Sequence, residues 1–238
     1  MDPLSPMPTQ KPAITLMEMA WLDYLTGNTA AELVITSSLG TTQIMPIEIF
    51  FRDPPNFTPQ EWMALELCRG RVLDIGAGCG SHCLWLQDQG LEVWGLDASE
   101  VAIQIMQQRG VYRLDHGDLF SFSQSGFNTL LLLMNGIGIV QTLDQLQPFL
   151  DQARNWLAPG GQILFDSTDL NLEPSLDLTE DYPGNVILTV KYRGQISLPM
   201  RWLYLDSDTL EQQADQAGWQ CQILYQDREG EYLARLWC

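Results

Sequence analysis

The stretch Val72-Leu73-Asp74-Ile75-Gly76-Ala77-Gly78-Cys79-Gly80 decides the fold, because in it an apolar run passes directly into a glycine-rich turn. Glycine lets the backbone approach a ligand closely. A helix that starts just after such a turn presents unpaired N–H groups and a partial positive charge, which suit a carboxylate as well as a phosphate. The stretch therefore predicts a strand, a ligand-binding turn and the start of a helix, with a purely structural tight turn as the alternative.

Strand and helix signals alternate from Arg71 onward, which is typical of successive βα units. We expect strands at residues 71–75, 91–96, 111–115, 129–134 and 162–166. We expect the intervening helices at residues 81–89, 99–109 and 143–157, and Pro148 is expected to kink or divide the third. This alternation predicts an α/β fold with a doubly wound, mostly parallel sheet.

The segments outside this alternation carry other signals. Apolar residues recur at helical spacing over residues 13–26, and Thr58 with Glu61 has the capping-box pattern of a second helix that ends near Gly70. Two β-rich runs predict an inserted hairpin or flap, and a helix followed by an antiparallel pair of strands completes the chain. The runs are residues 186–192 and 195–205, the helix is 208–217, and the strands are 220–226 and 231–237.

These signals predict a single domain over residues 13–238, preceded by a flexible, proline-rich tail over residues 1–12. Within the domain we expect an N-terminal helical cap at 13–70, a cofactor-binding core at 71–170, a β-rich insertion or flap at 171–206, and a C-terminal helix and β-hairpin at 207–238. The tail has no basic segment followed by an apolar core, so it does not read as a signal peptide.

The glycine spacing separates two classes of cofactor. A nicotinamide site needs G-x-G-x-x-G, and the third glycine would fall where this chain has Ser81. The observed order, from Asp74 to Gly80, instead resembles the first motif of class I S-adenosylmethionine-dependent methyltransferases. Four later segments are similar to further motifs of that family: Val93–Asp97, His116–Leu119, Phe127–Asn135 and Leu157–Gly161.

The resemblance implies a Rossmann-like, seven-stranded sheet with an antiparallel C-terminal hairpin, and S-adenosylmethionine as cofactor with S-adenosylhomocysteine as product. It implies that Asp97 accepts hydrogen bonds from the ribose hydroxyls and that Asp118 accepts from the adenine amino group while Leu119 packs on the ring. The expected cofactor-binding residues are Asp74, Gly76, Ala77, Gly78, Gly80, His82, Asp97, Ala98, Asp118, Leu119, Met134 and Asn135.

The methyl acceptor is expected at the carboxyl ends of the strands, where doubly wound sheets bind their ligands. Asn135, Asp166 and Asp169 meet that condition and are the candidate catalytic residues, with solvated loop carboxylates as the alternative for the two aspartates. Asn135 is followed by Gly136-Ile137-Gly138 and not by the Pro-Pro-aromatic sequence of amino-directed nucleic-acid and glutamine methyltransferases. This departure argues against those two acceptor classes.

The amino-acid composition limits which classes of substrate and partner we expect. The formal net charge of −18 disfavours nucleic acid as a substrate. Five cysteines without zinc-site spacing indicate reduced thiols in the cytoplasm and no metal, and no apolar run is long enough for a membrane span. We therefore expect a cytoplasmic monomer or homodimer that methylates a small or medium-sized metabolite. A protein or peptide methyltransferase and a non-catalytic binding module are the alternatives.

Overall fold

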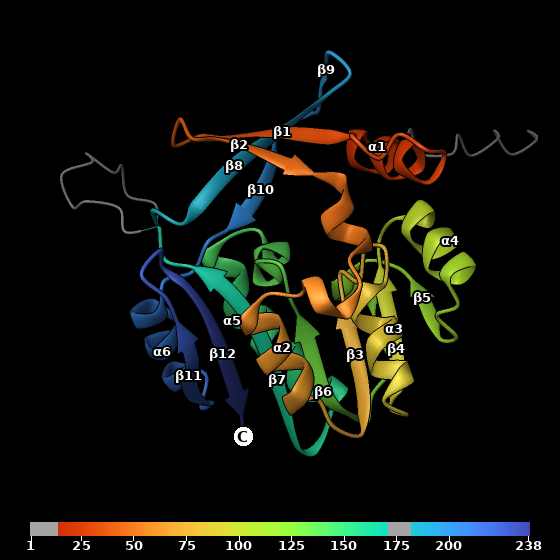
Figure 1. Cartoon of the computed structure of the whole chain (residues 1–238). Helices are drawn as coiled ribbons and strands as arrows, with labels where there is room; N and C mark the ends of the chain where they lie inside the picture. Colours follow the sequence, from red (N-terminus) through yellow and green to blue (C-terminus); the bar gives the residue numbers. More distant parts are fainter. Residues whose placement is uncertain (1–13, 171–181) are drawn as a thin grey trace, which may run out of the picture.

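A central sheet of seven strands forms the body of the molecule (Figure 1). The computed structural model describes residues 14–170 and 182–238, so the predicted tail and residues 171–181 of the predicted insertion lie outside the described residues. The strand order is β11-β12-β7-β6-β3-β4-β5. The strands are β3 (Arg71–Ile75), β4 (Glu92–Asp97), β5 (Leu114–His116), β6 (Phe127–Leu132), β7 (Leu157–Thr168), β11 (Gln220–Gln226) and β12 (Glu231–Trp237).

The directions of these strands agree with the predicted mixed sheet. Strands β3, β4, β5, β6 and β7 pair in parallel, whereas β12 runs antiparallel to β7 and β11 antiparallel to β12. Strands β3 and β6 are neighbours, and the chain leaves them toward opposite sides of the sheet. In doubly wound sheets ligands bind outside the carboxyl ends of the strands at such a switch point.

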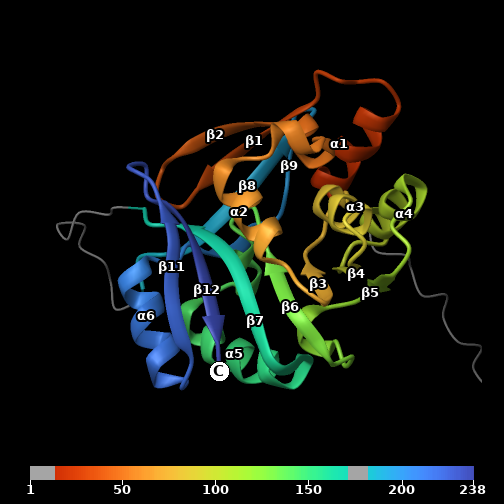
Figure 2. The ribbon, with the colours of Figure 1, turned by 60° about the horizontal axis from the view of Figure 1, so that its bottom comes forward.

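Helices cover both faces of the sheet (Figure 2). Residues of α5 (Leu146–Trp156) and α6 (Ser207–Gln216) join one buried apolar cluster with β3, β6, β7 and β12. Residues of α2 (Pro59–Leu67), α3 (Ser81–Asp88) and α4 (Glu100–Arg109) join another on the opposite face. Burial of these two apolar faces is the main force that holds the three layers together.

A second, antiparallel sheet lies across the carboxyl ends of the parallel strands (Figure 1). Its order is β10-β8-β1-β2, with β9 paired to β8. The N-terminal part of the chain supplies β1 (Glu32–Ser37) and β2 (Thr42–Pro46), and the insertion supplies β8 (Asn185–Tyr192), β9 (Gln195–Ile196) and β10 (Met200–Leu203). The predicted cap and the predicted flap are thus one structural layer, which we call the cap sheet.

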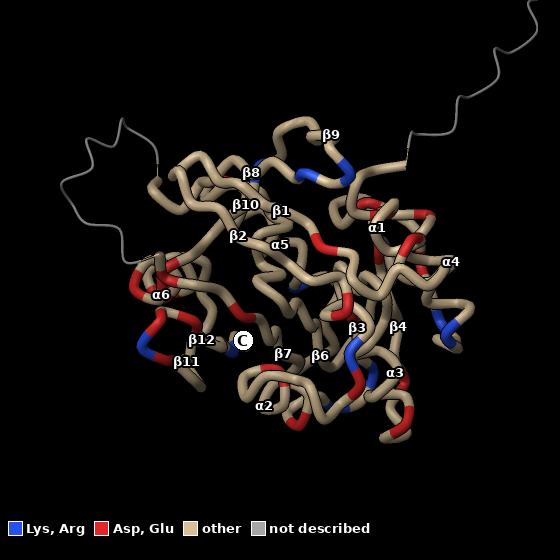
Figure 3. The backbone as a smooth tube through the Cα atoms, turned by 45° about the horizontal axis from the view of Figure 1, so that its top comes forward, with Lys and Arg blue, Asp and Glu red and all other residues tan. Residues whose placement is uncertain are grey.

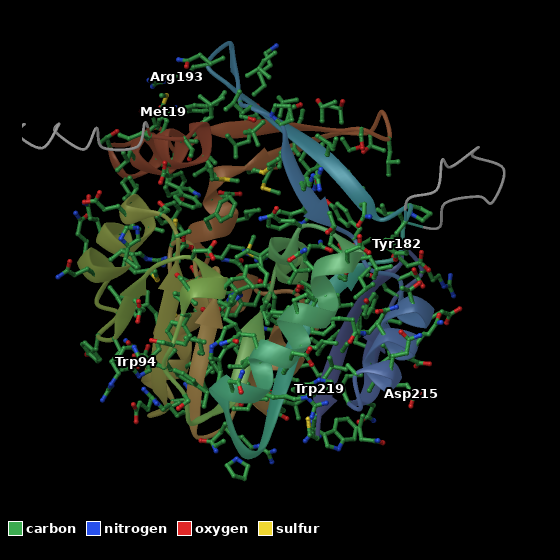
Figure 4. All side chains as sticks on the ribbon, turned by 180° about the vertical axis from the view of Figure 1, so that it is seen from behind. Met19, Trp94, Tyr182, Arg193, Asp215 and Trp219 are labelled. Atoms are coloured by element: carbon green, nitrogen blue, oxygen red, sulfur yellow. The ribbon has the colours of Figure 1, made fainter. Side chains whose placement is uncertain are left out.

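The helix α1 (Leu16–Leu25) is fixed to the cap sheet by its polar side chains. Asp23 accepts a hydrogen bond from the Tyr192 hydroxyl at 2.6 Å and forms an ion pair with Arg193 at 3.0 Å. Figure 4 shows Arg193 near Met19 of this helix. Figure 3 shows acidic residues both on the central sheet with its helices and on the cap with helix α1, while basic residues lie at the hairpin from β8 to β9. The cap therefore combines a helix and strands that are far apart in sequence.

Two local predictions need correction. The cap is not purely helical, because residues 32–46 form the β1–β2 hairpin, and η1 (Ile47–Phe51) and η2 (Pro54–Asn56) follow it. Pro148 does not kink the third predicted helix, because it lies in the first turn of α5, where its missing N–H has no helical acceptor to lose. The division falls instead between η5 (Leu143–Gln145) and α5.

The predicted capping box at α2 is present, and α1 has one as well. Thr58 accepts from the Glu61 N–H while Glu61 accepts from the Thr58 N–H, and Thr15 and Glu18 do the same at α1. These bonds satisfy N–H groups that a helix start leaves without partners. Across residues 14–170 and 182–238, no helix has the length and apolar character needed to cross a bilayer.

Candidate active site

Two adjoining cavities lie between the carboxyl ends of the parallel strands and the cap sheet. The first, of about 480 Å³, is bordered by the glycine-rich turn after β3, the end of β4 and helix α1. The second, of about 290 Å³, lies between the end of β7 and the inner face of the cap sheet. Residues shared by both linings are Met17, Phe50, Arg52, Met134, Met200 and Trp202. A ligand in one cavity is therefore next to a ligand in the other.

The glycine-rich turn borders the first cavity. Gly76 and Gly78 have φ values of 71° and 55°, in the left-handed region that favours glycine. A Cβ atom added to Gly76 would be 3.4 Å from Ile139, and one added to Gly78 would be 3.9 Å from its nearest neighbour, so neither glycine is needed for close packing. Both positions leave the backbone open to a ligand.

Gly80 has a different role from the other two glycines. A Cβ atom there would come within 2.8 Å of Met106 and 3.1 Å of Val111, so Gly80 permits close packing of α3 against α4 and its surroundings. It does not line the first cavity.

Asp97 ends β4 and lines the first cavity. Its Oδ2 accepts the Gly78 N–H at 2.9 Å and its Oδ1 accepts the Ser99 N–H at 2.8 Å. Burial raises the pKa of this carboxyl, and the two backbone hydrogen bonds oppose that rise. The carboxylate is held in one orientation next to the turn, with acceptor positions left for a ligand.

Helix α1 closes the first cavity from the cap side. Glu18 lines the cavity and hydrogen-bonds the Ser99 hydroxyl, next to the Ser99 N–H that binds Asp97. Trp21 lines it too, and its buried indole N–H has no hydrogen-bond partner within residues 14–170 and 182–238. A buried donor without a partner is uncommon in proteins. The cavity wall thus has unused hydrogen-bonding capacity.

A buried ion-pair network separates the two cavities. Glu61 Oε1 accepts from Arg52 at 2.6 Å and contacts His82 Nε2 at 2.9 Å, while Oε2 accepts the Thr58 N–H at 2.7 Å. Burial alone raises the pKa of Glu61, but the hydrogen bond and charge of His82, the Thr58 N–H and Arg52 together lower it to about 2. Glu61 is therefore ionised and fully engaged.

Arg52 also holds the segment that covers the cavities. It donates to the Ile49 carbonyl at 2.9 Å and to the Asn56 carbonyl at 3.2 Å. The Ser81 hydroxyl at the start of α3 donates to the Phe50 carbonyl at 3.0 Å. Residues 49–56 are thereby fixed over the glycine-rich turn.

Asp166, near the end of β7, is buried and lines the second cavity. Its Oδ1 accepts the N–H groups of Asn135 at 2.8 Å and Gly136 at 3.4 Å, and its Oδ2 accepts that of Met134 at 3.1 Å. Burial, assisted by the charge of Glu61, raises the pKa of Asp166 to about 7 even though the backbone hydrogen bonds lower it. This carboxyl changes charge near neutral pH.

The residues that Asp166 holds have unusual backbone geometry. Met134 and Asn135 have φ values of 65° and 55°, which are uncommon for residues with a Cβ atom. The Thr168 hydroxyl donates to Asn135 Oδ1 at 2.9 Å, which orients the Asn135 amide. Residues 134–136, between β6 and η4 (Gly136–Val140), are thus fixed from β7 at the border of the two cavities.

Most predicted site residues converge here. Those lining the first cavity are Asp74, Gly76, Ala77, Gly78, His82, Asp97, Ala98 and Met134. Asn135, Asp166 and Met134 line the second.

Four predicted site residues, Gly80, Asp118, Leu119 and Asp169, line neither cavity. Asp118 is exposed and accepts the Phe120 N–H at the start of η3 (Leu119–Ser121), while Leu119 is buried in the core. The Asp169 N–H donates to the Gly230 carbonyl. Contacts of these four with a ligand stay predictions.

Sequence reasoning missed the cap side of the site. Glu61 was recognised only as a capping residue, and Arg52 only as part of the N-terminal cap at 13–70, because an ion pair with His82 across 21 positions leaves no local pattern. The β1–β2 hairpin did have a local signal, since two short runs rich in β-branched and apolar residues, 33–36 and 41–45, lie on either side of Gly40. Trp202 and Tyr204 line the second cavity only because β10 pairs with β8.

Comparison with known proteins decides the family. A family model described as a methyltransferase domain matches residues 60–223. The chain belongs to the class I S-adenosylmethionine-dependent methyltransferases. S-Adenosylmethionine is accordingly its cofactor, as the resemblance in the sequence predicted.

Among solved structures, this methyltransferase is similar to an S-adenosylmethionine-dependent methyltransferase from Bacteroides fragilis in complex with S-adenosyl-L-homocysteine. The TM-score is 0.86 and the identity 33%, over 96% of this chain and 97% of that one. The DhpI-SAM-HEP complex is more distant, with a TM-score of 0.63 and 21% identity over 75% of this chain and 84% of that one, and it shows the fold alone.

Among curated proteins, the methyltransferase is similar to the demethylmenaquinone methyltransferase of Tropheryma whipplei (strain Twist), with 31% identity over 99 residues. That alignment spans 39% of this chain and 39% of the relative. The similarity to the biotin biosynthesis bifunctional protein BioHC of Cellvibrio japonicus is 23% over 74% of this chain and 33% of the relative.

The residues of the first cavity fit the cofactor of the family. The two open glycines leave room for close approach, Asp97 retains acceptor capacity, and the Trp21 indole N–H has no partner in the part of the chain that the structure describes. A bound sulfonium supplies a methyl group that is already activated, so the protein contributes mainly position and exclusion of water.

Proposed function

We propose that this methyltransferase transfers the methyl group of S-adenosylmethionine to a small or medium-sized metabolite bound in the second cavity. The observation that carries this proposal is the position of that cavity, which adjoins the first through six shared residues and has a volume of about 290 Å³. Pockets for small ligands are typically ~300–1,000 Å³, so this one suits a compact acceptor.

In this proposal the first cavity binds the cofactor. Asp97 accepts the ribose hydroxyls, while Gly76 and Gly78 let the backbone approach the amino-acid part. Asp74 is buried at the end of β3 and lines the same cavity, where its carboxyl suits the cofactor ammonium group. Met134, which lines both cavities, lies where the methyl group would face the acceptor.

Asp166 is the proposed proton acceptor when the acceptor atom carries a proton. Three backbone N–H groups occupy part of its acceptor capacity, and Oδ2, which accepts only one of them, has capacity left. The new bond forms between the acceptor atom and the methyl carbon, the carbon–sulfur bond breaks, and the proton passes to Oδ2. A pKa of about 7 suits a general base at neutral pH.

The curated relatives support a small acceptor without selecting one. One is named for demethylmenaquinone and another for biotin biosynthesis, and each alignment covers less than two thirds of the relative's length. A screen of methyl acceptors should therefore include demethylmenaquinone and compounds of biotin biosynthesis.

The test is transfer of an isotopically labelled methyl group from S-adenosylmethionine to a panel of metabolites and, in parallel, to a pool of proteins and peptides. We expect label in the low-mass fraction, much less label with Asp97→Ala at an S-adenosylmethionine concentration that does not saturate the variant, and a rate that rises with pH through about 7 because Asp166 must be ionised. Label confined to the peptide fraction would replace the proposal by a peptide methyltransferase. Cofactor binding without transfer to any acceptor would point to a binding module.

A further inference from the structure

The charged side chains that line the second cavity already have partners. Arg52 donates to Glu61 and to two carbonyl groups, and Glu61 also contacts His82 and accepts the Thr58 N–H. Asp166 accepts three backbone N–H groups. Glu231, which is exposed, accepts from Gln60 at 2.7 Å. Arg52 is the one cationic side chain among the described lining residues, and its charge is paired with Glu61, so this lining presents no unpaired positive charge to an acceptor.

Several neutral polar groups in the same lining have no protein partner among the described residues, and the Gln43 amide and the Trp202 indole N–H are among them. A third is the amide nitrogen of Asn135, because the amide oxygen of that residue is taken by the Thr168 hydroxyl at 2.9 Å. A fourth is the hydroxyl of Tyr204, which is half-buried and comes from the segment just after β10. Burial raises the pKa of Tyr204, which keeps the phenol protonated and able to donate.

The Asn135 amide is held in one orientation. Its backbone is fixed in the left-handed region at φ 55° by Asp166 and its side chain is fixed by Thr168. A donor held in place before binding costs less conformational entropy when a ligand arrives.

The remaining wall is largely apolar. The inner face of the cap sheet contributes aliphatic and thioether side chains from β1, β2, β8 and β10, and the indole of Trp202 borders both cavities. The apolar side chains are Ile35, Met45, Leu188, Val190 and Met200. This wall suits the body of an aromatic or aliphatic molecule.

We infer that the second cavity selects an acceptor without a negative charge that has an apolar body and an oxygen atom that accepts from the Asn135 amide, with the Tyr204 hydroxyl as a second contact. Thr168 is a positioning residue that directs the Asn135 amide N–H groups to that oxygen. This inference rests on the proposed function and adds the acceptor class to it.

Desolvation explains the selection against negative charge. A carboxylate group that leaves water needs an opposite charge or several hydrogen bonds in exchange. In this cavity the Arg52 guanidinium is engaged with Glu61, so a carboxylate acceptor would have to break that pair. An acceptor without a negative charge gains the apolar contacts and the two hydrogen bonds without that loss.

The test measures binding of three ligands with one ring system to the full chain saturated with S-adenosylhomocysteine, by ligand-observed NMR. The ligands are 2-naphthol, 2-ethylnaphthalene and 2-naphthoate. We expect 2-naphthol to bind about 5- to 10-fold more tightly than each of the other two, as expected for one or two neutral hydrogen bonds. Equal or tighter binding of 2-naphthoate, or of the hydrocarbon, would overturn the inference.

Substitutions of Thr168 and Tyr204 test whether these residues cause the preference for 2-naphthol. Thr168→Val and Tyr204→Phe should each weaken 2-naphthol binding by about 3- to 10-fold and leave the affinity for S-adenosylhomocysteine unchanged, whereas Thr168→Ser should behave like the wild type. A wild-type affinity in both Thr168→Val and Tyr204→Phe would overturn the inference. If wild-type protein does not bind S-adenosylhomocysteine, the proposed function fails first, and that result is distinct from a failure of acceptor selection.

Discussion

Asp166 Oδ1 accepts the backbone N–H of Asn135 at 2.8 Å, so a carboxylate of β7 fixes a left-handed residue that follows β6. The same carboxylate holds Met134 and Gly136, and Met134 and Asn135 lie at the border of the two cavities. The shape of the site therefore depends on a side chain from the adjacent strand.

Replacement of Asp166 by asparagine should loosen residues 134–136. One amide oxygen can still accept from Asn135 and Gly136, but the amide nitrogen would face the Met134 N–H, donor against donor. We expect the free energy of unfolding to fall by about 1–3 kcal/mol, the cost of a buried polar group left without a partner. Urea unfolding measures this, with the exposed Asp151→Asn on α5 as control. Equal stability of Asp166→Asn and wild type would show that the hydrogen bonds do not hold the turn.

Stability in acid should depend on Glu61. Its pKa in the folded protein is about 2, below its ordinary value of 4.5, so its contribution is complete above pH 4.5 and is lost as the pH falls toward 2. The difference corresponds to about 3 kcal/mol. Urea unfolding of Glu61→Gln between pH 5 and 2 should show a shallower loss than wild type, while Glu66→Gln, an exposed change on the same helix, should follow wild type. Parallel curves for Glu61→Gln and wild type would contradict the assigned ionisation.

A single methyl group at Gly138 should displace Trp202. A Cβ atom at this position would lie 2.1 Å from the indole nitrogen of Trp202, which borders both cavities. We expect Gly138→Ala to weaken S-adenosylhomocysteine binding by about 3- to 10-fold and to destabilise the fold by about 1–3 kcal/mol, as overpacking does. Calorimetry and unfolding curves measure the two effects.

The control for that prediction is a double-mutant cycle. In a Trp202→Leu background the obstructing ring is gone, so Gly138→Ala should add little further loss. Additive effects of the two changes would mean that the methyl group acts through something other than Trp202.

The central sheet could be predicted from the sequence because each of its signals is local. The glycines after β3, the acidic end of β4 and the apolar run of β6 are each patterns of a few consecutive residues. Family resemblance then connected them to one cofactor, and comparison with known proteins confirmed it.

The acceptor side was harder to predict because it is made by long-range pairing. Strand β8 pairs with β1 across more than 150 positions, as in the pair Ile35 and Val190. This pairing and that of β10 with β8 bring Leu188 and Tyr204 into the same cavity lining as Asp166. The Arg52–Glu61–His82 network likewise joins residues whose separate local patterns indicated a cover, a helix cap and a helix start. Asn135 and Asp166 could be predicted as site residues from their positions at strand ends. The hydrogen bond from the Asn135 backbone N–H to the Asp166 carboxylate could not be predicted from the sequence.

We infer that the cavity after β3 binds S-adenosylmethionine through Asp97. Calorimetric titration of S-adenosylhomocysteine measures this binding without any methyl acceptor. We expect saturable, one-to-one binding to the wild type, unchanged binding to Asp88→Ala, an exposed change on α3, and a loss of about 10- to 100-fold with Asp97→Ala, as for hydrogen bonds to a charged group. Absence of binding to the wild type, or wild-type affinity in Asp97→Ala, would contradict the account.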